Sequence, residues 1–437
     1  MKYISRTLEP ELKRRLFSGK ALVLYGPRQC GKTTLIKHLT AEYGDGVLWM
    51  NGDNPDTRNT LVQITTANWK RLLGSRKILV LDEAQRIENI GMALKLVTDE
   101  LPNVQVIASG SSSFELMNRT AEPLTGRKFE YHLLPFSFGE LCEEQGLFAE
   151  KQEREKRMLF GSYPDVVANP GDEQRRLGEL AGSYLFKDIY ALDGLRRTSI
   201  LDKLIRALSM QIGSEVNYSE LAGLTGTDGK TVERYIELLT KCYIVFPLGA
   251  YSGNLRNEIK KGFKIFFYDL GIRNAVINNF TPLASRNDAG GMWENYLILE
   301  RLKKNLNQPF PPRSFFWRTM APQSHEIDYL EEAQGRLRAW EIKSNPRTKA
   351  KIPQTFLPFI TMSFGHLIPA STPVFSDIAF DTASAAISVS MEARSGAKSG
   401  LSTSVINIPT PAGDSNPLPR RPRPASCFSA TASVPVG

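Results

Sequence analysis

The stretch KALVLYGPRQCGKTTL, residues 20–35, constrains the fold of this chain more than any other. A short apolar run leads into a glycine-containing loop, which leads into a helical pattern. The loop, residues 26–33, fits G-x-x-x-x-G-K-[ST] with every fixed position filled. Its glycines let main-chain N–H groups turn inward, and at a helix N-terminus they cradle an anionic phosphate chain. A chance glycine-rich turn is the alternative, but the order strand, loop, helix favours a phosphate-binding loop.

This motif predicts a role for individual loop residues. Lys32 would reach the β- and γ-phosphates of a nucleoside triphosphate, and the Thr33 hydroxyl would hold Mg²⁺. Thr34 would lie on the α-phosphate side. The expected cofactors are ATP and Mg²⁺, and the predicted binding residues in the loop are Gly26, Pro27, Arg28, Gln29, Cys30, Gly31, Lys32, Thr33 and Thr34.

From Lys20 to about Ser112 an apolar strand, a turn and an amphipathic helix recur. Continuous rather than alternating apolar runs indicate strands covered on both faces, hence a parallel sheet between helices. The predicted class is therefore α/β. The predicted strands are KALVLY (20–25), GVLWM (46–50), KILVLD (77–82) and VQVIAS (104–109).

The run ILVLDEAQ, residues 78–85, ends an apolar strand in two acids. Asp82 falls at the carboxyl end of the strand, where open α/β sheets bind ligands. We expect Asp82 to accept a water bound to Mg²⁺ and Glu83 to polarise the attacking water as a catalytic residue. Two solvated acids ending a strand are the alternative, which the phosphate-binding loop upstream disfavours.

Two further elements are predicted for the same site. In VIASGSSS, residues 106–113, either Ser111 or Ser109 would lie beside the attacking water, although a Gly-Ser turn explains these residues equally well. Arg127, with Arg119 as a substitute, is a candidate arginine finger, acting in its own chain or on a neighbouring subunit. A solvated or ion-paired arginine is the alternative reading.

Residues 200–250 have a different pattern, in which a helix, a short helix, a glycine-containing turn and another helix precede an apolar strand. This order is that of a helix-turn-helix with a wing. Lys230, Thr231 and Arg234 would face outward at the start of the recognition helix and suit contacts with DNA. Glu233 and Glu237 dilute that charge, and winged helices also dock on proteins, so a protein partner stays open.

The segment HEIDYLEEAQGRLRAWEIK, residues 325–343, reads as a hairpin with acids on both arms. A turn centred on Gln334-Gly335 puts Asp328 opposite Glu341, and Lys343 projects from the same face as Glu341. Two carboxylates held together repel each other unless a cation lies between them, which predicts a second metal site. Alternating apolar residues also fit the solvated face of an ordinary antiparallel pair.

The chain of 437 residues is long enough for several domains. Its Ser/Ala/Pro-rich end cannot bury enough apolar surface to offset ordering entropy and is predicted to be disordered. The predicted units are 1–145, the nucleotide-binding core; 146–199, a helical lid region; 200–255, winged-helix-like; 256–360, an α+β unit; and 361–437, the disordered tail.

Together these stretches resemble a family of prokaryotic AAA-superfamily P-loop ATPases that end in a restriction-endonuclease-like domain of unknown function. The matching segments span roughly residues 1–358 and include YGPRQCGKTTL, ILVLDEAQRI, LTGRKFEYHLLPFSFGEL, WENYLILERL and EIDYL…WEIKSNP. The resemblance implies nucleotide and magnesium roles for Lys32, Thr33, Asp82 and Glu83. The hairpin acids and Lys343 are similar to the PD-(D/E)XK nuclease arrangement, with Glu294 as the additional upstream acid. The chain departs from the family pattern after about Pro358.

Composition narrows the function classes. No apolar run approaches the ~18 residues that cross a bilayer, and the start lacks a secretory signal, so a cytoplasmic protein without a membrane partner is expected. The four cysteines are scattered along the chain and do not have the spacing of metal ligands. A net charge of +9 is compatible with DNA, and the resemblance leaves a homo-oligomer open. The leading hypothesis is an ATPase coupled to a DNA- or partner-binding C-terminal half. One alternative is a nucleotide-gated binding module whose nuclease-like domain does not cleave, and another is a PD-(D/E)XK DNA nuclease. A third is that the last domain is incomplete and only the ATPase half is competent.

Overall fold

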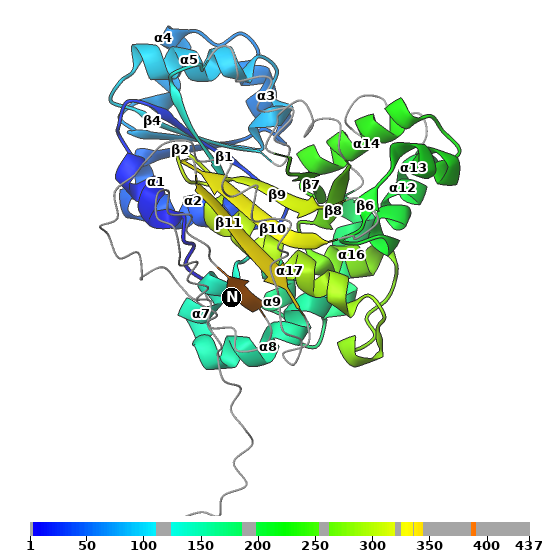
Figure 1. The fold of residues 1–437 in the computed structure, drawn as a ribbon. Helices are drawn as coiled ribbons and strands as arrows, with labels where there is room; N and C mark the ends of the chain where they lie inside the picture. The colour runs from blue at the N-terminus through cyan, green and yellow to red at the C-terminus, as the bar shows by residue number, and fades with distance from the viewer. Residues whose placement is uncertain are drawn as a thin grey trace, which may run out of the picture.

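The computed structural model describes residues 3–110, 124–185, 198–252, 262–319, 325–334, 336–343 and 386–389. Two sheets organise these residues, one in the N-terminal part and one in the C-terminal part (Figure 1). In these described ranges, no helix combines the length and apolar character needed to span a membrane.

The N-terminal sheet is parallel, with the strand order β2-β3-β4-β1-β5. The predicted parallel sheet is confirmed, and the four predicted strands correspond to its first four members. The fifth, β5, was missed because KFEYH alternates polar and apolar residues, as expected of an edge strand. The strands are β1 (Ala21–Tyr25), β2 (Val47–Asn51), β3 (Ile78–Asp82), β4 (Gln105–Gly110) and β5 (Lys128–His132).

Helices cover both faces of this sheet. Successive strand residues point to opposite sides, so the continuously apolar strands present apolar side chains to both helix layers. Leu22 and Leu24 of β1 pack on Leu35 of one helix layer, whereas Val23 packs with Leu94 of the other. The helices are α1 (Glu9–Arg15), α2 (Lys32–Thr40), α3 (Pro55–Leu61), α4 (Thr66–Leu73) and α5 (Ile90–Glu100), with 3₁₀ turns η1 (Ala41–Gly46) and η2 (Ala84–Arg86).

A helical segment follows β5. Ser137 and Glu140 form a reciprocal capping box at the start of its first helix. Tyr163 and Leu177 from this segment pack on Ile272 of the C-terminal part. The elements are α7 (Phe138–Gln145), α8 (Leu147–Phe160), α9 (Pro164–Val167), α10 (Glu173–Glu179) and the π-helical turn η3 (Leu180–Leu185).

The C-terminal sheet has the order β12-β11-β10-β9-β7-β8-β6 and is antiparallel except where β7 pairs with β9. Figure 1 shows its central strands beside the N-terminal sheet, with α12–α14 at the far end. The strands are β6 (Glu215–Val216), β7 (Val245–Ala250), β8 (Phe263–Phe267), β9 (Arg313–Arg318), β10 (Glu326–Ala333), β11 (Arg336–Ile342) and β12 (Ala386–Val389).

The helices of this part include those predicted between residues 200 and 250. Leu204 and Val232 from these helices pack on Ile265, and Ile298 of α17 packs on Phe316 and Tyr329 of the sheet. The helices are α12 (Thr198–Met210), α13 (Tyr218–Thr225), α14 (Gly229–Lys241), α16 (Leu270–Val276) and α17 (Ala289–Asn305), with the 3₁₀ turn η4 (Leu283–Ser285). Because β7 pairs with β9, the predicted units 200–255 and 256–360 share one sheet.

One segment of the tail differs from the prediction of disorder. Ala386–Val389 forms β12, which pairs antiparallel with β11 from Ala339 to Ile342. The β-branched residues of AISV favour an extended strand, and the free edge of β11 offers backbone donors and acceptors to pair with it. The other residues from 344 onward lie outside the described part of the chain.

The end of β5 is bound to the C-terminal part. The Asn307 side chain accepts a hydrogen bond from His132 N (2.7 Å) and donates one to His132 O (2.8 Å). His132 Nδ1 lies 2.6 Å from the Tyr243 hydroxyl. Lys303 Nζ donates to the Phe136 carbonyl at 2.8 Å. The last residue of β5 and the residues after it are therefore bound to the C-terminal part by hydrogen bonds, most of them to backbone groups.

Candidate functional site

The phosphate-binding loop runs from the end of β1 to the start of α2, as the sequence predicts. Gly31 adopts φ of 99°, a left-handed conformation that glycine adopts without steric cost. At Gly26 an added Cβ would lie 2.0 Å from the Leu133 carbonyl oxygen. Gly26 is therefore required by the close approach of two backbone segments. Side chains at Gly26 and Gly31 would therefore be incompatible with the backbone conformation of the loop.

Lys32 folds back across this loop. Its Nζ donates to the carbonyl oxygens of Gly26 and Pro27, both at 2.8 Å, and the residue is only 4% exposed. The ammonium group thus lies at the centre of the loop, held by two neutral acceptors. An anion entering the loop would offer it a charged acceptor, which makes a stronger bond.

Thr33 and Asp82 lie in direct contact beside the loop. Thr33 Oγ1 donates to Asp82 Oδ2 at 2.8 Å. Asp82 Oδ1 accepts from the Ser109 hydroxyl and from Glu83 N at 3.2 Å. Of the two serines predicted here, Ser109 on β4 makes this contact, and Ser111 lies outside the described residues.

The hydroxyl of Thr33 and the carboxylate of Asp82 are hard oxygen donors of the kind that Mg²⁺ prefers. They converge on one point next to the loop, so the donor set fits the predicted magnesium ion. Thr33 and Asp82 are the residues that would hold it.

Glu83 occupies an unusual backbone conformation at the end of β3. Its φ and ψ are 48° and 42°, in the left-handed region. An added Cβ on Gly52 would lie only 2.3 Å from the Glu83 carbonyl oxygen. Gln85 Nε2 donates to the Glu83 carboxylate at 2.7 Å. The backbone turn and this hydrogen bond fix where the half-buried carboxylate lies.

Arg127 lies at the other edge of the sheet. Its carbonyl accepts from Ala21 N at the first residue of β1, whereas the phosphate-binding loop follows the last residue of β1. The strand length separates them by about 15 Å. Arg127 Nε is instead paired with Asp99 Oδ1 at 2.5 Å. The prediction that Arg127 serves the loop of its own chain is therefore wrong, because the strands are parallel; action on a neighbouring subunit stays a prediction, and Arg119 lies outside the described residues.

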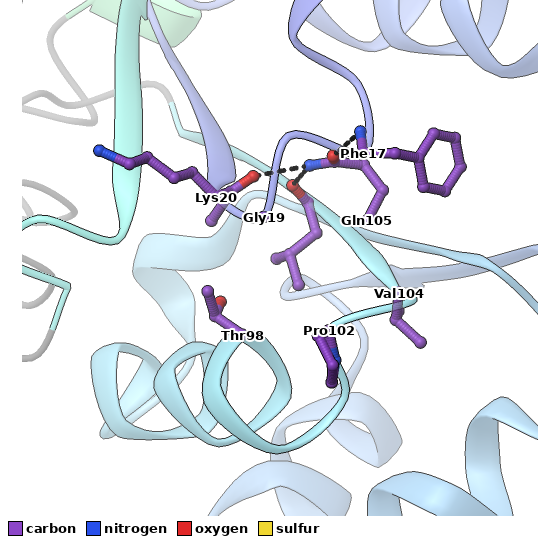
Figure 2. A pocket seen from close by; sticks show the side chains of 9 residues that line it. Phe17, Gly19, Lys20, Thr98, Pro102, Val104 and Gln105 are labelled. Atoms are coloured by element: carbon purple, nitrogen blue, oxygen red, sulfur yellow. Dashed lines mark hydrogen bonds between the residues drawn. The ribbon is translucent and has the colours of Figure 1, made fainter.

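A small pocket also lies at that opposite edge. Figure 2 shows Gln105 at its centre, with hydrogen bonds from Phe17 N to Gln105 Oε1 (2.5 Å) and from Gln105 Nε2 to the Lys20 carbonyl (3.0 Å). The amide of Gln105 thus fastens the turn before β1 to the start of β4. We assign this pocket a structural role and no part in the nucleotide site.

Arg6 is a residue of this site that sequence reasoning missed. It lies before α1, is 5% exposed, and donates to the carbonyl of Cys30 inside the loop at 2.9 Å. It also donates to Leu134 O at 2.5 Å and pairs with Glu140 Oε1 at 3.0 Å. A single arginine twenty residues before the motif carries no local pattern that could have identified it.

The hairpin of β10 and β11 has the predicted register. Tyr329 pairs with Trp340 and Ala333 with Arg336, and Gln334 has a left-handed φ of 50° at the turn. Asp328 Oδ2 accepts from Ile342 N at 2.6 Å. Lys343 Nζ contacts Glu341 and lies 3.8 Å from Asp328 Oδ2.

Glu294 on α17 lies near these acids, as predicted. Burial raises the pKa of Asp328, Glu341 and Glu294, and the Asp328 charge contributes to the raised pKa of the other two. Lys264, which the sequence reading did not consider, donates to Glu294 Oε1 at 2.9 Å and also contacts Glu326. In the part of the chain that the structure describes, no three His, Cys, Asp or Glu side chains form a metal-binding group. The second metal site thus stays a prediction.

A parallel sheet with a glycine loop after β1, a lysine and threonine opening α2, and an aspartate ending β3 defines the P-loop class of nucleotide-binding domains. Residues 18–142 match a family model described as an AAA domain. Residues 151–283 and 289–372 match models described as domains of unknown function, DUF8612 and DUF4143. The chain thus carries an AAA-type P-loop ATPase-like domain followed by two domains of unknown function.

Curated relatives align with about three quarters of this chain. An uncharacterized protein of Mycobacterium tuberculosis is 26% identical over 347 residues, covering 77% of this chain and 73% of the relative. An uncharacterized protein of Methanocaldococcus jannaschii is 21% identical over 352 residues, 75% of each. Among solved structures, Pif1 helicase from Candida albicans matches with a TM-score of 0.25 and 14% identity over 41% of this chain; the match spans about half of the helicase, 48%.

Proposed function

We propose that this protein binds and hydrolyses ATP in a magnesium-dependent manner and couples that cycle to a DNA- or partner-binding C-terminal half. The single observation that carries the proposal is the contact between Thr33 and Asp82 beside a loop that contains Lys32. A phosphate-binding loop, a cationic side chain and two oxygen donors for a divalent cation are the recurring parts of P-loop sites.

Each residue has a distinct task in this proposal. Loop amides from residues 26–33 bind the phosphates, and Lys32 leaves the carbonyls of Gly26 and Pro27 to contact the β- and γ-phosphates. Glu83 orients and polarises the attacking water, and Gln85 holds its carboxylate for that role. A magnesium ion on Thr33 and Asp82 would neutralise charge that develops on the phosphates. Ser109 keeps the second oxygen of Asp82 in place.

The contacts that follow β5 support coupling to the C-terminal half. Leu133 N donates to the Tyr25 carbonyl directly before the loop. The neighbouring residue His132 is held on both backbone groups by Asn307. A shift of the loop on nucleotide binding would therefore act on a segment that the C-terminal half also holds.

The arrangement of α12, β6, α13, α14, β7 and β8 supports a winged-helix unit. α13 and α14 form a helix pair, and β6, β8 and β7 pair antiparallel beside it. Asp228 caps α14 by accepting from Thr231 N at 3.0 Å. Lys230 and Arg234 are exposed on the first turns of α14 and would contact DNA phosphates. The alternative is that α14 docks on a protein.

Salt dependence separates these partners. DNA binding through Lys230 and Arg234 should weaken steeply with salt, and the double Lys230→Ala, Arg234→Ala variant should lose part of that dependence. Binding that ignores salt concentration would point to a protein partner. The most direct overall test is the ATPase rate with and without DNA at two salt concentrations.

A second candidate function is DNA cleavage by the hairpin site. The observation that favours it is the juxtaposition of Asp328, Glu341 and Lys343 on one face of β10 and β11. Lys264 pairs with Glu294 and Lys343 pairs with Glu341, so two of the carboxylates are neutralised by lysines. This pairing favours a binding module that does not cleave DNA. Incubation with plasmid and Mg²⁺ decides between them: nicking that disappears in Asp328→Ala supports the nuclease, and undiminished nicking by that variant removes the site.

A further inference from the structure

Arg6 contacts the phosphate-binding loop from outside, through the peptide that joins Cys30 to Gly31. Its guanidinium Nη1 donates to the Cys30 carbonyl at 2.9 Å. A trans peptide is planar, so its carbonyl and its N–H point in opposite directions. Fixing the Cys30 carbonyl toward Arg6 therefore fixes the Gly31 N–H toward the other side of the loop, where the phosphates of the proposed nucleotide would lie.

The guanidinium is itself held from several sides. Its Nη2 donates to Leu134 O, and its Nε pairs with Glu140 Oε1 at 3.0 Å. The Glu140 carboxylate also accepts from Thr7 N, at 2.9 Å, and from Ser137 N, at 2.9 Å. Burial alone would raise the pKa of Glu140, but the Arg6 charge and these donors lower it. The ionised form of the Glu140 carboxylate is therefore favoured beside Arg6.

Arginine is required here because three acceptors lie in three directions. A lysine keeps the positive charge, but a single ammonium group on a flexible stem does not reproduce the planar fork. The Arg6 guanidinium also stacks over the Phe136 ring, 4.7 Å from its centroid. These contacts place its Nη1 on the Cys30 carbonyl with little freedom.

We propose that Arg6 is a positioning residue of the nucleotide site, which orients the Gly31 amide toward the phosphates by binding the Cys30 carbonyl. The inference rests on the proposed function, because it concerns the same loop. It adds a residue that lies outside the motif and outside the region matched by the AAA family model.

The test uses Arg6→Lys in the full chain, which keeps the ion pair with Glu140 available. A fluorescent, non-hydrolysable ATP analogue with Mg²⁺ should bind the variant roughly tenfold more weakly, the loss expected for one charge-assisted hydrogen bond. Arg14→Ala is the matched control, since Arg14 is an exposed arginine of the same N-terminal segment. It should bind like the wild type.

A second readout needs no nucleotide. Cys30 and Cys242 are both buried, one in the loop and one in the C-terminal half. In Arg6→Lys the alkylation rate of Cys30, followed by peptide mass spectrometry, should rise while that of Cys242 stays unchanged. Equal acceleration of both cysteines means general destabilisation and overturns the inference. Wild-type affinity for the analogue overturns it as well, whatever the alkylation rate of Cys30.

The two readouts also separate this inference from the proposed function. A wild-type protein that does not bind the analogue contradicts nucleotide binding itself, whereas an affinity lost only in Arg6→Lys supports both. If Arg6→Lys does not fold, Glu140→Gln replaces it. That variant removes the ion pair that orients the guanidinium, so its folded fraction should bind the analogue more weakly than the wild type; wild-type affinity of that fraction overturns the inference.

Discussion

The hydroxyl of Thr33 donates a 2.8 Å hydrogen bond to the carboxylate of Asp82, a residue 49 positions further along the chain. The two residues open α2 and end β3, and β4 lies between β1 and β3 in the sheet. The parallel topology brings them together, because a helix that follows one strand begins at the edge where the other strand ends. That edge is where we place nucleotide and magnesium.

Asp82→Asn should remove most of the magnesium dependence of nucleotide binding. The amide is weaker than a carboxylate as a ligand for a hard cation, so affinity with Mg²⁺ should fall toward the affinity without it. Titration with a fluorescent ATP analogue, with and without Mg²⁺, measures this. Asp45→Asn, an exposed change in η1, should leave the magnesium effect intact. A full magnesium effect in Asp82→Asn would contradict the assignment.

Lys32→Ala should abolish measurable nucleotide binding, because it removes the ammonium group that lies against the Gly26 and Pro27 carbonyls of the phosphate-binding loop. The same titration tests it. Lys37→Ala, an exposed lysine of the same helix, is the matched control and should bind normally. ATP hydrolysis at the wild-type rate by Lys32→Ala would show that the loop is not the site.

Glu83→Gln should keep nucleotide binding and lose ~10²–10⁴-fold in hydrolysis rate, the range expected when a general base is removed. Phosphate release under saturating ATP measures the loss. Glu88→Gln changes an exposed acid just beyond η2 and should hydrolyse ATP at the wild-type rate. Equal rates for both variants would move the catalytic base elsewhere.

His132 should make the stability of the protein sensitive to pH below about 6.5. Burial lowers the pKa of His132 and outweighs the opposite effect of Glu130. The unfolded chain then binds a proton more readily than the folded one, so stability is full above the unfolded value of 6.5 and falls as pH drops below it. Melting temperature between pH 5 and 7.5 measures the slope, which His132→Asn should reduce; an unchanged slope would assign it to other groups.

Asn307→Ala should weaken the joint between the two halves. Two hydrogen bonds to His132 are lost, about 1 kcal/mol each, and the backbone of β5 is left without those partners. Calorimetry should then show separate unfolding of the two halves, whereas we expect the wild type to unfold in one transition. Asn307→Asp retains the acceptor for His132 N and should show a smaller effect. A single transition with unchanged midpoint in Asn307→Ala would contradict the joint.

The sequence predicts the parts of the site that depend on local pattern. Four continuous apolar runs identify four parallel strands, and the motif residues Lys32, Thr33 and Asp82 are brought together at the candidate site. Residues whose position depends on the tertiary fold escape this reasoning. Arg6 acts through its contact with a carbonyl, and β5 is an alternating edge strand. Arg127 was misplaced because sequence order does not reveal at which edge of the sheet a residue between strands lies.

The pairing of β7 with β9 has a practical consequence for anyone who wants to dissect this protein. A fragment that stops directly after β7 would lack both strands that pair with it, β8 and β9, and would expose the amides and carbonyls of β7. Such a fragment should self-associate. The two C-terminal units therefore form one structural unit, and a truncated or chimeric protein should contain both of them or neither.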